Sequence, residues 1–196
     1  MRVPDKSKPK LTHGAVKRQV KRSRGGGWAW IAVPLIGAIG LIVLAIWAGS
    51  RSNDVLKNVQ QFPDQGNFHL SALTQKHDPY NSDPPTSGPH MPSIVQWNFY
   101  TTPEPLEYLV HNMEDGGVVV YYRPNVSDAV KQRLKGLQQQ RPNAVIVVPG
   151  SDSQKEEVIL TAWTVMLRQP TYDDQSAKAF IVRYAGIDHH LQGGQG

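Results

Sequence analysis

The sequence contains no cysteine among its 196 residues. Disulfide bonds, zinc fingers and thiol catalysis are therefore excluded. The absence does not identify the compartment, because a protein without cysteine can work on either side of a membrane.

Several enzyme motifs are also missing. The chain has no GxSxG nucleophile elbow, no GxxxxGK[ST] phosphate loop and no GxGxxG turn. Ser87 lies three residues before His90, but a serine and a histidine that are close in sequence do not make a catalytic triad. The sequence therefore identifies no reaction, and it favours a binding protein over an enzyme without deciding between them.

The net positive charge of the chain is confined to its N-terminus. The net charge is +5, but residues 1–24 hold nine Lys and Arg and one acid, Asp5, so they carry +8 and the remaining chain carries −3. A basic domain that binds nucleic acid would not segregate its charge in this way, so nucleic acid is not an expected partner. Residues 1–27 have almost no apolar side chains and end in three glycines, which predicts a disordered basic arm.

Residues 28–48 are 21 residues without a charge, about the length that crosses a bilayer as a helix. Trp28, Trp30 and Trp47 lie at its two ends, where indole rings prefer the interface. A cleaved signal peptide is the alternative, but its apolar core is shorter and the only passable cleavage site is Ala48-Gly49-Ser50. The flank of a membrane span that is richer in Lys and Arg normally stays in the cytoplasm. We therefore expect a single-pass bacterial cell-membrane protein with a cytoplasmic N-terminus and an extracytoplasmic C-terminal part.

The remaining chain divides into three parts. Residues 49–61 are polar and predict a stalk, either a short helix or a linker. The folded extracytoplasmic domain is expected over residues 62–187. Residues 188–196 are expected to be a flexible tail, in which His189 and His190 have no specific role.

Hydrophobic periodicity within the domain predicts an α+β fold, a compact mixed sheet with about three helices and a proline-rich loop. The predicted strands are residues 118–122, 144–148 and 158–167, the last apolar on both faces with a buried Trp163 at its centre. The predicted helices are residues 105–115, ended by two glycines, a helix capped by Ser127, and a last helix that begins near Asp173.

The proline-rich loop, residues 77–92, contains five prolines. Proline fixes φ and drives the preceding residue out of the helical region, so this loop is nearly rigid. A rigid loop gives His90, together with Thr86 and Ser87, a fixed direction. The loop therefore marks a candidate site.

The helix predicted over residues 105–115 places Glu107, His111 and Glu114 on one face at 100° per residue. Two carboxylates beside a histidine stabilise the protonated imidazole or complete a metal shell. The alternative is a solvated helix face with ordinary polar neighbours three and four residues apart. Spacing alone favours this alternative.

A resemblance to a known family favours a shared site over a solvated helix face. The run PPTSGPH over residues 84–90 follows His69 and precedes the turn from His111 to Glu114, which leads into GGVVVYY. This pattern resembles a bacterial membrane-anchored family, the domain of unknown function family 3105, over about residues 60–186. The resemblance implies a membrane-tethered outer domain with no established activity.

The resemblance also selects His69, His90, His111 and Glu114 as one candidate metal site. Members of this family usually have a His-x-x-Glu-His-Gly turn, and here Asp115 stands in place of the second histidine. Asp115 either supplies a harder ligand or marks a site that has been lost in this chain.

Imidazoles with carboxylates suit zinc, copper, nickel or iron, and copper or zinc is the expected cofactor. Thioethers from Met91 or Met113 would favour copper(I), although Met113 also belongs to the apolar stripe of its helix. A shared site requires the His90 and His111 rings to lie within about 5 Å of each other, with His69 nearby. The alternative function is a non-metal interaction module that docks an envelope protein or polymer.

Overall fold

The computed structural model describes residues 56–190, which contain a mixed five-stranded sheet in the order β1-β5-β4-β2-β3 and three helices. The strands are β1 (Val59–Gln61), β2 (Val118–Tyr122), β3 (Val145–Pro149), β4 (Val158–Ala162) and β5 (Val165–Gln169). The helices are α2 (Leu106–Glu114), α3 (Asp128–Gln140) and α4 (Asp174–Tyr184). The predicted α+β domain with a mixed sheet is confirmed.

Most predictions for the two ends of the chain concern residues outside the described range. The basic arm (1–27), the transmembrane helix (28–48), most of the stalk (49–61) and the last residues of the tail lie outside the described residues. Within residues 56–190, no helix combines the length and the apolar character that a membrane span requires. Val59–Gln61, at the end of the predicted stalk, form β1 and pair antiparallel with β5.

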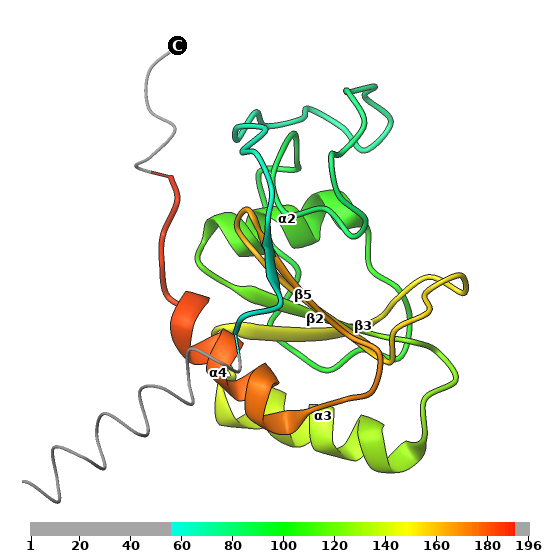
Figure 1. Ribbon diagram of the computed structural model, residues 1–196. Coiled ribbons are helices and arrows are strands. Elements are labelled where there is room, and N and C mark those ends of the chain that lie inside the picture. Colours follow the sequence, from blue (N-terminus) through cyan, green and yellow to red (C-terminus); the bar gives the residue numbers. More distant parts are fainter. Residues whose placement is uncertain (1–55, 191–196) are drawn as a thin grey trace, which may run out of the picture. The chain divides into compact units, whose positions relative to one another are not determined.

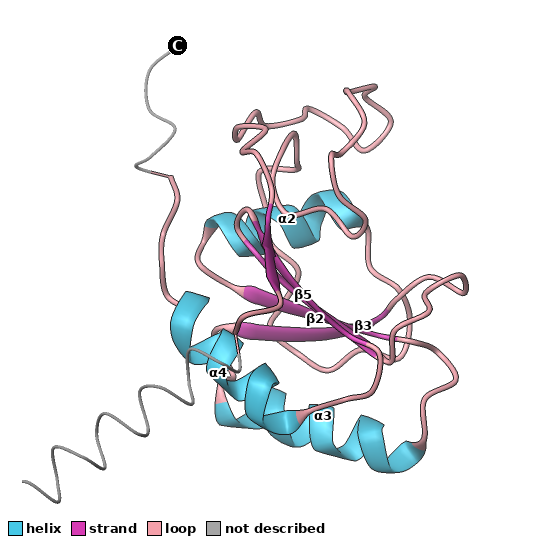
Figure 2. Cartoon of the chain, in the orientation of Figure 1, coloured by secondary structure: helices cyan, strands magenta, loops and turns pink. Residues whose placement is uncertain are grey.

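Helices cover both faces of the sheet. Strands β2 and β3 are parallel and are joined through α3, whereas the other neighbouring strands are antiparallel. Helices α3 and α4 lie on one face and α2 lies on the other, as Figures 1 and 2 show. Every residue of β2, β3 and β4 is therefore buried, which explains why these strands are continuous apolar runs.

Alternate strand residues supply two separate cores. On the face of α3 and α4, Leu160 belongs to a core with Leu134 and Phe180. On the face of α2, Ile159 belongs to a core with Leu109 and Met113. Successive residues of a strand point to opposite faces, so one strand serves both cores.

Local signals explain where the helices begin. The Ser127 hydroxyl accepts a hydrogen bond from the Val130 amide at the start of α3, as its cap position predicts. Asp173 caps α4 in the same way and accepts from the amides of Gln175 and Ser176. The predicted Ser127 cap and the predicted start of the last helix near Asp173 are confirmed.

The single strand predicted over residues 158–167 is wrong. The segment forms two strands, β4 and β5, which pair antiparallel and are joined by Trp163 and Thr164. Thr164 has φ +61°, a value that β-branched residues rarely adopt. The turn carries no Gly or Asn signal and both strands are buried, so the sequence reads as one uninterrupted apolar run. The prediction that Trp163 is buried is confirmed, although this residue lies in the turn.

Candidate metal centre

The run PPTSGPH lies against α2, within the long loop region that precedes this helix (Figure 1). Thr86 and Ser87 are fully buried, and both bind backbone groups. Ser87 Oγ accepts a hydrogen bond from the Gln65 amide at 3.0 Å, and the Thr86 carbonyl accepts one from the Thr164 amide at 2.9 Å. These contacts hold the loop in place, so the two residues help to position His90.

His69 and His90 lie side by side on neighbouring segments that form a parallel β-bridge. The His90 amide donates to the Phe68 carbonyl at 3.0 Å, and the Leu70 amide donates to the His90 carbonyl at 2.7 Å. The two imidazole rings lie 4.9 Å apart, centroid to centroid. Backbone hydrogen bonds between the two segments therefore fix the separation of these histidines without the help of a metal ion.

Helix α2 supplies His111 and Glu114. The Asn112 side chain holds the helix against the loop, since its amide donates to the Val95 carbonyl and accepts from the Val95 amide, both at 2.9 Å. The Glu114 side chain is fully buried, so the solvated-face alternative is wrong at this position. Glu107 is not part of the cluster, because its nearest ionic contact is His77, at 4.0 Å.

The three histidines of the candidate site converge on one oxygen of this buried carboxylate. His90 Nε2, His111 Nδ1 and His69 Nε2 lie 2.9, 3.4 and 3.5 Å from Glu114 Oε2. The His90 and His111 rings lie 5.1 Å apart, which is the separation that a shared site requires. Donor atoms of His69, His90, His111 and Glu114 all lie within 4.8 Å of one another. The structure therefore brings together the four residues of the candidate site.

These distances fit a metal shell. Zinc–nitrogen and zinc–oxygen bonds of about 2.0 to 2.2 Å place tetrahedral ligand atoms roughly 3.4 Å apart. The distances from His111 Nδ1 and His69 Nε2, 3.4 and 3.5 Å, match this value, whereas the distance from His90 Nε2, 2.9 Å, is shorter. His111 Nδ1 is buried and has no hydrogen-bond partner among the described residues, which is costly unless the nitrogen binds an ion.

The Nδ1 atom of His90 makes a hydrogen bond to the backbone. His90 Nδ1 lies 2.7 Å from the Gly88 carbonyl, which can only accept, so Nδ1 carries a proton and Nε2 is the nitrogen available to a cation. Metal-bound histidines commonly donate their other N–H to a backbone carbonyl in this way. Gly88 has φ +116° and a Cβ there would lie 3.2 Å from the Tyr80 ring, so this turn requires glycine.

The surroundings of His111 favour its neutral form, and those of Glu114 favour its ionised form. Burial lowers the pKa of His111, against the opposing effects of Asp115 and Glu114. Burial alone would raise the pKa of Glu114, but hydrogen bonds from Asn67 and His90 and the charges of nearby histidines hold it below its usual range. These are the protonation states that a metal ligand needs.

Sequence reasoning missed His190. This residue was expected to have no specific role, but its Nε2 lies 3.3 Å from Glu114 Oε2 and 3.6 Å from Asp115 Oδ1. His189 stacks on the Trp163 ring at 5.7 Å. The only local signal was the Asp-His-His run itself, because its distance from α2 along the sequence hides the contact.

Met113 belongs to the hydrophobic core, as its place in the apolar stripe of its helix predicts. Met113 is fully buried in the core between α2 and the sheet. The grouped metal donors in the described part of the chain are imidazole nitrogens and carboxylate oxygens. This donor set suits a divalent ion such as zinc or copper(II) better than copper(I), which prefers thioethers and thiolates.

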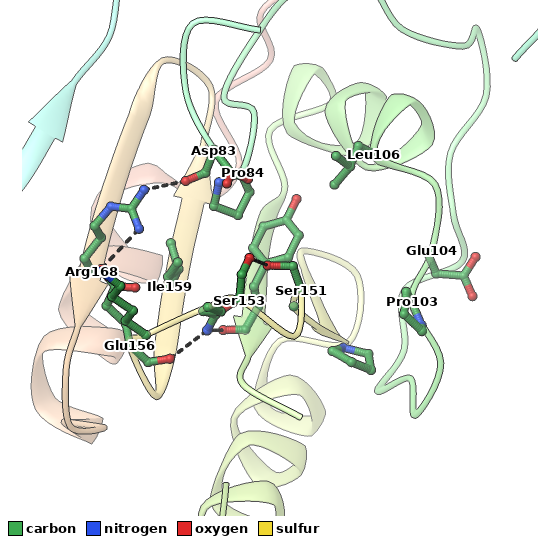
Figure 3. Close-up of a pocket in the computed structure, with 15 residues that line it drawn as sticks. Asp83, Pro84, Pro103, Glu104, Leu106, Ser151, Ser153, Glu156, Ile159 and Arg168 are labelled. Carbon is green, nitrogen blue, oxygen red and sulfur yellow. Dashed lines mark hydrogen bonds and ion pairs between the residues drawn. The ribbon is translucent and has the colours of Figure 1, made fainter. Parts of the chain in front are cut away.

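A cleft of about 400 Å³ lies near the other end of α2, and its lining includes Leu106, Tyr121 and Ile159 (Figure 3). Arg168 enters this cleft, but it already binds Glu156 Oε1 at 3.2 Å and the main-chain carbonyl of Asp83. The lining contains none of the clustered histidines. The cleft and the histidine cluster are therefore separate features.

Comparison with known proteins identifies the family. No curated protein and no solved structure matches the chain. A family model described as protein of unknown function (DUF3105) matches residues 72–193, more than half of the sequence. The matched range begins after His69 and includes His90, His111, Glu114 and His190. The chain therefore belongs to the DUF3105 family, as the resemblance in its sequence indicated.

Proposed function

We propose that this domain binds a divalent transition-metal ion through His69, His90, His111 and Glu114. One observation carries the proposal: the imidazole nitrogens of these three histidines lie within 3.5 Å of a single oxygen of a fully buried carboxylate, and His190 Nε2 lies 3.3 Å from the same oxygen. Burying a carboxylate without a compensating positive partner is strongly unfavourable, so this arrangement calls for a cation.

The donor set supports zinc or copper(II) as the ion. Three nitrogens and one oxygen suit these borderline ions, whereas calcium and magnesium prefer shells of oxygen alone. The four proposed ligand atoms are imidazole nitrogens and a carboxylate oxygen. Zinc is the first ion to test, because its tetrahedral shell matches the number of donors and their spacing.

The site supports binding more than catalysis. Catalytic zinc sites usually have three protein ligands and an open position, whereas this set supplies four. His90 and Glu114 are completely buried, while the His69 side chain is 43% exposed and gives the ion a route from solvent. Such a site holds or transfers an ion more readily than it activates water.

The proposed function includes a location. The apolar run over residues 28–48 and its basic flank support a single-pass anchor with this domain outside the cytoplasm, where it would meet ions and envelope protein partners. A reporter fused after Gly196 should then be active only outside the cytoplasm. Activity inside the cytoplasm, or a mature chain that begins near Ser50, would contradict the anchored topology.

A titration tests the metal site. The metal-free full chain in detergent micelles is titrated with Zn²⁺ by calorimetry, and Co²⁺ is used in parallel because its visible absorption reports tetrahedral coordination. Tight binding of Zn²⁺ should be weakened at least tenfold in Glu114→Gln, which keeps the shape of the side chain and removes its charge.

The matched control is His77→Ala. His77 lies in the same proline-rich loop, but it contacts Tyr80 and Glu107 and lies outside the cluster. Its replacement should leave Zn²⁺ affinity unchanged. Circular dichroism of each variant separates loss of binding from loss of folding. A folded wild-type chain that binds neither ion would refute the proposed function.

A further inference from the structure

A second group of potential ligands lies beside the first. Donor atoms of His111, Asp115 and His190 lie within 4.8 Å of one another, and His190 is not a member of the first set. His190 Nε2 is 3.6 Å from Asp115 Oδ1, and His111 Nε2 is 4.0 Å from the same oxygen. Two imidazoles and a carboxylate are again a transition-metal donor set.

The segment after α4 is held in place against the end of α2. The Gly186 amide donates to the Gly116 carbonyl at 2.7 Å, and the His189 amide donates to the Glu114 carbonyl at 2.9 Å. Gly116 has φ +81°, and a Cβ there would lie 2.8 Å from the backbone of Ile187. Glycine at this position therefore permits the close approach that delivers His190 to the site. In Figure 1 this segment leaves α4 as a red trace.

The His190 ring is oriented as a ligand. Its Nδ1 lies 2.8 Å from Asp188 Oδ1, and its amide donates to the same oxygen at 2.9 Å. A carboxylate accepts, so Nδ1 donates and Nε2 is left facing Glu114 and Asp115. A carboxylate behind a histidine is a common second-layer arrangement at metal centres. His90 is oriented in the same way by the Gly88 carbonyl.

We propose that His111, Asp115 and His190 hold a second divalent transition-metal ion, so that the domain contains a dinuclear centre. This inference rests on the proposed function, because His111 belongs to both sets. One nitrogen cannot serve two ions, but His111 Nδ1 faces Glu114 at 3.4 Å and Nε2 faces Asp115 at 4.0 Å. When both ions are bound, the His111 ring bridges them as an imidazolate, and its remaining N–H proton is released to solvent.

The two positions differ in exposure. The first set is closed by four donors, of which His90 and Glu114 are fully buried. The second set has three protein donors, and the side chains of Asp115 and His190 are 33% and 38% exposed. Three ligands leave an open coordination position for water or an incoming ligand. The second ion should therefore bind more weakly and exchange faster than the first.

Metal stoichiometry tests this proposal. The full chain in detergent should bind two equivalents of Zn²⁺ in a tight and a weaker phase. His190→Ala and Asp115→Asn should each remove the weaker phase and leave the tight phase within about twofold of the wild-type affinity. His77→Ala should keep both phases. If both ions are Cu²⁺, the bridge should couple their spins and reduce the paramagnetic resonance signal, and His190→Ala should restore an uncoupled signal from one ion.

Each outcome separates the two proposals. One equivalent that His190→Ala leaves unchanged would overturn the second position and keep the first. One equivalent whose affinity falls in His190→Ala would make His190 a ligand of a single ion, which also overturns the dinuclear centre. No binding by the folded wild-type chain would overturn the proposed function itself.

Discussion

His90 Nε2 lies 2.9 Å from Glu114 Oε2, and neither side chain is exposed to solvent. His90 Nδ1 donates to the Gly88 carbonyl, so Nε2 is the nitrogen that faces the carboxylate. A metal ion bound between Nε2 and Oε2 would take the place of this direct contact. Because metal ligands must be deprotonated, metal affinity at this pair should fall in acid.

The first prediction concerns the effect of metal on stability. Zn²⁺ at 100 times its dissociation constant should stabilise the folded chain by about 2.7 kcal/mol, because the unfolded chain lacks the assembled site. The thermal midpoint measured by circular dichroism should rise with Zn²⁺ and return on chelation. Glu114→Gln should show a much smaller rise. An equal rise in this variant would place the bound ion elsewhere.

The second prediction concerns Trp163, which is buried at the β4–β5 turn. Its indole N–H donates to Asp64 at 3.1 Å, and its ring meets His90 edge-on at 6.1 Å. Trp163→Ala should lower the free energy of unfolding by about 3 to 5 kcal/mol, since it empties a core position. Chemical denaturation checks this value. Trp163→Phe removes the hydrogen bond but keeps an aromatic ring in the core, so it should lower the free energy of unfolding by less. Equal losses in the two variants would mean that packing is not the cause.

The third prediction concerns the strained turn at Thr164, whose φ is +61°. Its amide and carbonyl are both hydrogen-bonded, to Thr86 and Phe62, so the backbone is held in this conformation. Thr164→Asn should stabilise the domain by about 1 kcal/mol, because asparagine tolerates the left-handed region better than a β-branched residue. Thr164→Val keeps the branch and should give no gain in the denaturation midpoint.

The fourth prediction concerns acid and the α4 cap. Hydrogen bonds, first that from the Ser176 hydroxyl, lower the pKa of Asp173 below its usual value. The stabilisation from this carboxylate is therefore present above the pKa of the unfolded chain and is lost as pH falls through the lower pKa of the folded chain. Asp173→Ala should cost about 1 kcal/mol at pH 7.

The matched variant for this cap is Asp173→Asn. Asparagine caps helices about as well as aspartate but does not titrate, so it should cost little at pH 7. The difference in unfolding free energy between Asp173→Ala and the wild type should shrink in acid. A difference that is independent of pH would show that the charge of Asp173 does not contribute.

Local periodicity was enough to predict much of the fold. Strand β2 has the predicted bounds, α2 and β3 differ from prediction by about one residue, and Ser127 caps α3. These elements follow from side chains close in sequence, which share a helix face or a strand face regardless of the rest of the molecule. The β4–β5 turn could not be predicted in this way, because a hairpin between two buried strands has no change of polarity to mark it.

For the candidate site, too, part of the arrangement could be predicted from the sequence and part could not. The sequence by itself determined that Glu107, His111 and Glu114 share a helix face, that prolines stiffen the loop of His90, and, through the family resemblance, that His69 belongs with them. Tertiary structure decided which of these residues meet: Glu114 is buried among the imidazoles, and Glu107 lies apart.

Only the tertiary structure added His190. Metal coordination depends on atoms within a few ångströms in space, whereas periodicity reports neighbours along the chain. His90 and Glu114 are 24 residues apart in sequence, and His190 reaches the same carboxylate only because the backbone after α4 bonds to the end of α2. Those contacts depend on how the sheet and its helices pack, and no local pattern in the sequence records them.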